Sequence, residues 1–165
     1  MGMTIIDAEE SMIPQLAALE EQCFSMPWTE QQLRSQLPDA SHEFIAAVDG
    51  GRVLGYVGMM FVLDEGYISN VAVSPECRRQ GIGDALIAEM DSRAKRRALS
   101  FATLEVRESN APAIALYSKH GYVPVGTRKN YYDLPRENAI LMTKFFTEIY
   151  IFRKKIIRKL FITTV

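Results

Sequence analysis

A short segment rich in glycine and arginine separates a strand-like stretch from a helix-like stretch, and it restricts the folds open to this chain. It consists of Arg78, Arg79, Gln80, Gly81, Ile82 and Gly83. Glycines at such a junction let backbone N–H groups come close to a ligand, and the N-terminus of the following helix favours negative charge. The arginines add charge suited to phosphate oxygens. The segment therefore predicts an anion site at a strand-to-helix turn.

Three kinds of phosphate loop compete for this segment. A Walker loop would end in Gly-Lys-Ser/Thr, whereas Asp84 follows the last glycine, and a dinucleotide fingerprint would need a third glycine. The remaining pattern, Arg-x-x-Gly-x-Gly, resembles the pyrophosphate loop of the GCN5-related N-acetyltransferases (GNAT). The loop alone leaves one plain alternative open, a basic turn that only caps a helix.

Charge is distributed unevenly along the 165 residues. The formal net charge is −1, which gives no global case for nucleic-acid binding, and we expect no DNA partner. Residues 148–165 hold five basic residues and one glutamate and carry +4, so residues 1–147 carry −5. We therefore predict a basic amphipathic tail at 148–165 and a separate domain at 1–147, which the resemblance implies is an N-acetyltransferase (GNAT) domain.

The cysteines and the N-terminal sequence indicate the cellular compartment of the protein. Cys23 and Cys77 are far apart and form no Cys-x-x-Cys pair, which predicts neither a metal site nor a disulfide framework. The N-terminus shows no secretory signal pattern, and no window has the apolar length of a membrane span. The expected location is the cytoplasm.

The periodicity of apolar residues predicts an α/β fold with a mixed sheet. Helices are expected at 11–22, 29–37, 83–97 and 110–120, and strands at 43–48, 53–63, 67–73, 101–107, 122–129 and 138–146. A helix between two strands of one sheet indicates a crossover, so the middle of the sheet should contain a parallel pair.

Two residues after the glycine loop have the chemistry of an acid and a base. Glu105 interrupts an apolar strand, where a carboxylate has a desolvation cost unless it meets water, a partner or a substrate. Asn110, Ile114 and Tyr117 are spaced so that they share one helix face. The short connection between strand and helix predicts that Glu105 and Tyr117 converge on one cleft.

Amide formation from an acyl thioester uses such groups. Glu105 would accept the proton of the amine, and the Tyr117 hydroxyl would protonate the departing thiolate. Backbone N–H of Val71 or Val73 would polarise the carbonyl if a bulge there leaves donors unpaired. Glu105 and Tyr117 each have a plain structural alternative. A glutamate on a strand often forms a salt bridge, and a tyrosine on a helix often belongs to the core. The nearby Arg107 would be a surface residue.

Several motifs in order resemble one GNAT subfamily, the bacterial ribosomal-protein alanine N-acetyltransferases (RimI), over about Thr4 to Met142. Besides the glycine loop, they are Pro27-Trp28-Thr29, the run from Leu104 to Tyr117, Gly121-Tyr122, the run from Arg128 to Tyr132, and the run from Asn138 to Met142. The resemblance implies the GNAT fold, in which helices flank a mixed central sheet and a parallel strand pair splays apart to admit the acyl carrier.

The resemblance also implies roles for particular residues. Glu105 would be the general base and Tyr117 the general acid. Acetyl-CoA, as co-substrate, would be held by Val71, Ala72, Val73, Arg78, Arg79, Gln80, Gly81, Ile82, Gly83, Asp84 and Asn110. Trp28, Tyr131 and Tyr132 would form the walls of a peptide groove. The implied substrate is the N-terminal alanine of the eighteenth protein of the small ribosomal subunit.

Other functions remain open from the sequence alone. A GNAT enzyme that acetylates a lysine or a small amine is the nearest alternative, followed by a non-catalytic acyl-CoA-binding regulator and a basic ribosome adaptor. The tail at 148–165 departs from the family. It would lie on an anionic membrane or contact ribosomal RNA, or else pack on its own domain, pair with another subunit or stay disordered.

Overall fold

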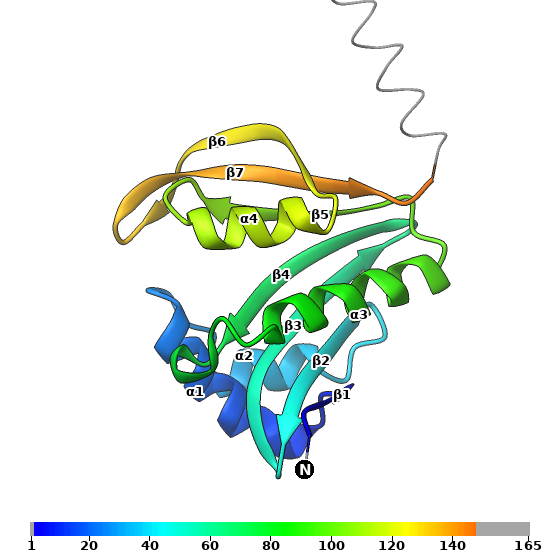
Figure 1. The fold of residues 1–165 in the computed structure, drawn as a ribbon, viewed down its shortest axis with the longest axis vertical. Coiled ribbons are helices and arrows are strands. Elements are labelled where there is room, and N and C mark those ends of the chain that lie inside the picture. The colour runs from blue at the N-terminus through cyan, green and yellow to red at the C-terminus, as the bar shows by residue number, and fades with distance from the viewer. Residues whose placement is uncertain (1, 148–165) are drawn as a thin grey trace, which may run out of the picture.

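The computed structural model describes residues 2–147, which form one seven-stranded sheet with helices on both faces (Figure 1). The strands are β1 Thr4–Asp7, β2 His42–Asp49, β3 Arg52–Val62, β4 Glu65–Val73, β5 Phe101–Arg107, β6 Val123–Asp133 and β7 Arg136–Phe145. The helices are α1 Ile13–Cys23, α2 Glu30–Gln36, α3 Ile82–Arg96 and α4 Ala111–Lys119, with short 3₁₀ turns at Glu10–Met12 and Pro75–Cys77. The strand order is β1-β2-β3-β4-β5-β7-β6.

Each face of the sheet has its own apolar core. On one face, α3 and α4 bury Leu86, Ile87 and Met90 against the strands. On the other face, α1 and α2 bury Leu16 and Leu33. Strand side chains alternate between the two faces, and β2, β3 and β4 contribute buried residues to both cores. Within residues 2–147, no helix has the length and apolar character needed to cross a membrane.

The predicted fold class is confirmed, including the parallel pair, which is β4 with β5. Side chains cap the N-termini of two helices: Thr29 and Gln32 form a capping box at α2, and Asn110 caps α4. Two expectations were wrong. The edge strand β1 was missed because it has only four, mostly exposed residues, and β6 continues beyond the predicted end at 129 to Asp133. The tail predicted at 148–165 lies outside the described residues.

The parallel strands separate after a short paired stretch. Glu65–Tyr67 pairs with Phe101–Thr103, and beyond these residues β4 and β5 continue without pairing to each other. Figure 1 shows the two strands diverging. A parallel pair that opens in this way leaves backbone donors and acceptors unpaired along the gap. The predicted splayed pair is therefore confirmed.

A buried carboxylate on α1 joins three parts of the fold beside this gap. Glu20 is fully buried and accepts hydrogen bonds from Trp28 N at 2.8 Å, from Asn70 Nδ2 at 2.8 Å and from the Tyr56 hydroxyl. Burial and the neighbouring Glu20 carboxylate raise the pKa of Tyr56, which keeps that hydroxyl a donor. The carboxylate thus links α1, the loop before α2 and the central strands β3 and β4.

We expect Glu20→Ala to lower the free energy of unfolding by about 3 kcal/mol or more, since it leaves two buried donors and one half-buried donor without their acceptor. Urea unfolding followed by far-UV circular dichroism measures this. Glu21→Ala, at the exposed neighbouring position, is the matched control and should change stability by less than about 0.5 kcal/mol. Equal stabilities of the two variants would contradict this role for Glu20.

Candidate active site

The glycine loop forms a left-handed turn that opens α3. Arg79 and Gly81 have φ values of +60° and +81°, and Gly81 is the N-cap residue of the helix. The first N–H groups of an α-helix have no partner within it, and no side chain of the described residues caps this end. Such a turn followed by free helix donors is suited to an anion. The loop therefore has the geometry expected of a pyrophosphate site.

The two glycines of this loop serve different purposes. A side chain at Gly81 would meet no atom within 4 Å, so the left-handed backbone is what requires glycine there. A Cβ at Gly83 would lie 3.2 Å from Leu116 Cδ2, so glycine there permits close packing of α3 on α4. Gly83 is thus explained by helix packing, in addition to any contact with a ligand.

Arg78, Gln80 and the following Asp84 each contact neighbouring residues. Arg78 Nε donates to Val73 O at 3.3 Å, and Gln80 Nε2 donates to Glu76 O at 3.3 Å. Asp84 accepts from Lys119 Nζ and His120 Nε2, both at 2.8 Å, and these bonds lower the pKa of Asp84. Two residues at the end of α4 therefore hold the Asp84 carboxylate at the first turn of α3.

The strand that leads into the loop presents backbone donors to the gap. Ser74 N donates to Leu54 O on β3 at 2.8 Å. Because N–H groups alternate in direction along a strand, those of Val71 and Val73 point away from β3, toward the side where β5 has separated. The irregularity of β4 lies elsewhere: Gly58 pairs with Asn70 and Met59 with Ile68, which leaves Ser69 as an extra residue. The bulge that was the stated condition for unpaired donors at Val71 or Val73 is therefore absent there, and the divergence of the strands leaves these N–H groups facing the gap instead.

Glu105 lies on β5 beyond the paired stretch, with its side chain 26% exposed. Its Oε1 is 3.1 Å from Arg128 Nε on β6. The salt bridge that the sequence left as the plain alternative is thus present. Arg128 is itself 57% exposed, and an exposed ion pair is weakly held, so another cation is able to take its place at the carboxylate.

Tyr117 lies on α4 and is almost fully buried, 6.0 Å between ring centroids from Tyr122. Burial, followed by the neighbouring Tyr132, raises the pKa of Tyr117, so its hydroxyl stays protonated at neutral pH. Among residues 2–147 this hydroxyl has no hydrogen-bond partner. Tyr117 is therefore a core residue, as in the plain alternative, and its role as general acid stays a prediction.

Tyr132 lies close enough to both candidate catalytic residues for their charges to affect one another's pKa. Burial raises the pKa of Tyr132 to about 12, and Glu105 contributes to that shift, while Tyr132 in turn contributes to the shift at Tyr117. No hydrogen bond within the described residues joins Glu105 directly to Tyr117. The tyrosine on β6 is thus near both of the groups that the sequence predicted to share one cleft.

The predicted walls of the groove come from two separate elements. Tyr131 and Tyr132 are in edge-to-face contact, 5.0 Å between ring centroids, on a β6 irregularity between Arg128 and Tyr132 that turns Tyr131 outward. The Arg128–Tyr132 segment is therefore part of the strand, and the hairpin turn comes after it, at 134–135. The opposite element is the loop between α1 and α2, which carries Trp28.

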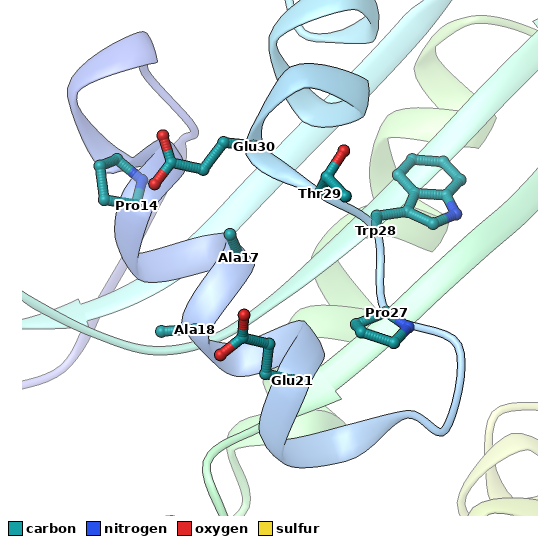
Figure 2. Close-up of a pocket in the computed structure, with 8 residues that line it drawn as sticks. All are labelled: Pro14, Ala17, Ala18, Glu21, Pro27, Trp28, Thr29 and Glu30. Carbon is teal, nitrogen blue, oxygen red and sulfur yellow. The ribbon is translucent and has the colours of Figure 1, made fainter.

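A surface cavity of about 310 Å³ lies between α1 and this loop (Figure 2). It is lined by Pro14, Ala17, Ala18, Glu21, Pro27, Trp28, Thr29 and Glu30. In Figure 2 the indole of Trp28 points away from Ala17 and Ala18. None of the residues predicted to hold acetyl-CoA line this cavity, so it is separate from the glycine loop.

Arg107, which the sequence suggested to be a surface residue, is instead a central contact of this region. Its side chain is 22% exposed and donates to Leu134 O, Pro135 O, Glu137 Oε2 and Ser25 Oγ. It also lies 4.2 Å above the Tyr132 ring centroid. The available signal was its position two residues after Glu105, which places both side chains on one face of the strand.

Comparison with known proteins identifies the family. The acetyltransferase (GNAT) family matches residues 13–122. The chain belongs to the GNAT acetyltransferases. The predicted family and co-substrate are thereby confirmed: the chain is an acyltransferase that uses acetyl-CoA.

Relatives of this acetyltransferase modify a ribosomal protein. This chain is 34% identical over 141 residues to the [ribosomal protein bS18]-alanine N-acetyltransferase of Escherichia coli K12, and the match covers 84% of this chain and 95% of the relative. It is 35% identical over 125 residues to a putative enzyme of the same name from Bacillus subtilis 168, covering 75% and 83%.

Solved structures agree with the fold of the acetyltransferase. The crystal structure of the ribosomal-protein-S18-alanine N-acetyltransferase from E. coli matches with a TM-score of 0.82 and 32% identity over 88% of this chain and 95% of that one. Arabidopsis thaliana NAA60 in complex with acetyl-CoA matches with a TM-score of 0.81 at 20% identity, covering 88% and 99%, and shows the fold alone.

Proposed function

We propose that this acetyltransferase transfers the acetyl group of acetyl-CoA to the N-terminal alanine of ribosomal protein bS18. The relatives named for this reaction share about a third of their residues with it along most of their length. The single structural observation that carries the proposal is the position of Glu105, a partly exposed carboxylate on β5 beyond the point where β4 and β5 separate. The enzyme then works in the cytoplasm, where ribosomes assemble.

Direct transfer needs a base at Glu105. The N-terminal α-amine has an unperturbed pKa of about 8, so at neutral pH it arrives mostly as the ammonium ion. This ammonium replaces Arg128 at the Glu105 carboxylate, directly or through water, and loses a proton to it. The free amine then attacks the thioester carbon.

The carbonyl oxygen and the leaving thiolate have their own partners in the proposed reaction. The N–H groups of Val71 and Val73, which point into the gap, donate to the oxygen as negative charge develops. Tyr117, whose hydroxyl is protonated, gives its proton to coenzyme A sulfur and takes up the surplus proton of the nitrogen that has attacked, so that the amide and the thiol are both neutral. The glycine loop at Gly81 holds the pyrophosphate, and Asn110 lies at the start of the neighbouring helix α4.

The choice of an N-terminus over a lysine rests on the shape of the groove. Trp28 on one side and Tyr131 and Tyr132 on the other are large, partly exposed rings on elements that flank Glu105. Such walls are suited to an extended peptide end. A lysine or small-amine substrate remains the second candidate.

A steady-state assay with two forms of one peptide tests the proposed function. The peptide has the N-terminal sequence of bS18 from the same organism, with a free or a blocked α-amine. We expect a mass increase of one acetyl group on the free form and no product from the blocked form. Acetylation of the blocked peptide at a lysine would favour the second candidate, and no product from either peptide would contradict the proposal.

A further inference from the structure

Arg107 is the last residue of β5 and makes an unusual number of contacts for a residue at a strand end. It donates from Nη2 to Leu134 O at 2.8 Å and to Ser25 Oγ at 3.2 Å. It donates from Nη1 to Pro135 O at 2.9 Å and to Glu137 Oε2 at 3.1 Å. Its terminal nitrogens are therefore fully engaged in a fixed geometry.

These partners belong to two elements that are far apart in the sequence. Leu134 and Pro135 form the turn of the β6–β7 hairpin, and Glu137 is the second residue of β7. Ser25 belongs to the loop between α1 and α2. In Figure 1 the tip of the hairpin and the loop after α1 lie on the same side of the molecule. Both elements carry the aromatic walls of the proposed peptide groove. One guanidinium thus bridges the two walls.

The contacts on the hairpin side form a closed arrangement. Ser109 N donates to Glu137 Oε1 at 2.5 Å while Arg107 holds the other oxygen. Bonds from Ser109, and then from Arg107, keep the pKa of Glu137 below its usual value, so the carboxylate remains charged. The guanidinium also lies against the face of Tyr132, where a cation is attracted to the ring. Arg107 therefore orients a groove residue as well as the turn.

Fewer hydrogen bonds hold the loop between α1 and α2 in position. Trp28 N is held by Glu20 at 2.8 Å, and Ser25 is held by Arg107 at 3.2 Å. The first contact ties the loop to α1, whereas the second ties it to the opposite wall. The second is thus the contact that relates the loop to the hairpin.

We propose that Arg107 is a positioning residue that sets the separation and orientation of the two walls of the peptide groove. This inference rests on the proposed function for the identity of the groove. Arginine is required because two main-chain carbonyls, a carboxylate and a hydroxyl are bound by one planar group. The compact ammonium of a lysine does not reach this set of acceptors.

The single tryptophan of the chain, Trp28, reports on the loop without any substrate. We expect Arg107→Met to increase quenching of Trp28 fluorescence by acrylamide and to lower fluorescence anisotropy. Ser25→Ala removes only the hydrogen bond from Arg107 to the exposed Ser25, and it should also increase the quenching. Arg136→Met, at an exposed arginine of the same hairpin, is the matched control and should behave as wild type.

Kinetics on the same variants separate positioning from general damage. We expect kcat/KM for the peptide to fall by about 10- to 100-fold in Arg107→Met, mainly through KM, while the dissociation constant of acetyl-CoA stays unchanged. Arg107→Lys should recover only part of the loss, since it restores charge without the fork of donors.

Wild-type quenching and KM in both Ser25→Ala and a folded Arg107→Met would overturn the inference. If Arg107→Met does not fold, Ser25→Ala decides: increased quenching with a raised KM supports the role of Arg107, and wild-type behaviour overturns it. The quenching experiment needs no acceptor peptide. The two proposals can therefore fail separately. If Trp28 quenching increases in the variants but the wild-type enzyme acetylates no peptide, Arg107 still links the two walls and only the proposed function is rejected.

Discussion

Glu105→Gln is expected to lower kcat/KM for the peptide by about 10² to 10⁴ at pH 7, because the amide cannot accept the proton of the attacking ammonium. The substitution keeps the shape of the side chain and an oxygen for Arg128, which is 3.1 Å from the carboxylate. Steady-state kinetics across pH measure the effect. The loss should become smaller above pH 8, where the α-amine with a pKa of about 8 is already deprotonated.

The control for this prediction is Glu108→Gln, an exposed glutamate three residues along whose Oε2 accepts from Asn138 Nδ2 at 3.2 Å. It should retain wild-type turnover. Calorimetric titration should give the same acetyl-CoA affinity for wild type and for Glu105→Gln, since the carboxylate is not part of the glycine loop. Turnover by Glu105→Gln within about twofold of wild type would remove Glu105 from the mechanism.

Gly81→Val is expected to weaken acetyl-CoA binding by at least about 100-fold. The left-handed φ of +81° is strained for a β-branched residue, and adjustment of the backbone turns the N–H groups away from the pyrophosphate. Loss of two charge-assisted hydrogen bonds, at about 1.5–3 kcal/mol each, corresponds to a change of this size. Isothermal titration with coenzyme A measures it.

A matched glycine separates ligand binding from backbone strain. Gly51, in the turn between β2 and β3, has a φ of +83°, and a Cβ there would also meet no atom within 4 Å. Gly51→Val therefore has a comparable conformational cost at a residue outside the loop. We expect it to bind coenzyme A as wild type does. Equal losses of affinity in both variants, or none in Gly81→Val, would show that the left-handed turn at Gly81 does not hold the pyrophosphate.

Local features of the fold were predictable because neighbouring residues determine them. The capping box at Thr29, the cap at Asn110 and the hairpin turn at Gly50 and Gly51 each satisfy backbone groups within a few residues, and the structure contains all of them. The alternation of apolar residues predicted six of the seven strands. The strand missed, β1, has too few buried residues to leave a pattern.

Some candidate site residues were predictable for a similar reason. A carboxylate in an apolar strand has a desolvation cost, and a glycine before a helix has a cost in conformational entropy. Glu105 and Gly81 therefore stand out in the sequence as residues that need a further role. Their roles as base and pyrophosphate contact remain predictions. Arg107 does not stand out, because an arginine at the end of a strand is ordinary until its partners at Ser25 and Leu134 are known.

By itself, the sequence determined the class of the fold, the order of its elements apart from β1, the family and the glycine loop before α3, since each leaves a signal in residues close together in the chain. Only the tertiary structure decided that Val71 and Val73 face a gap, that Arg128 pairs with Glu105 and that Arg107 joins two walls. These depend on where β5 separates from β4 and on how the β6–β7 hairpin lies against the loop after α1. Contacts between residues so far apart in the chain arise from packing of the whole domain, and no local pattern encodes them.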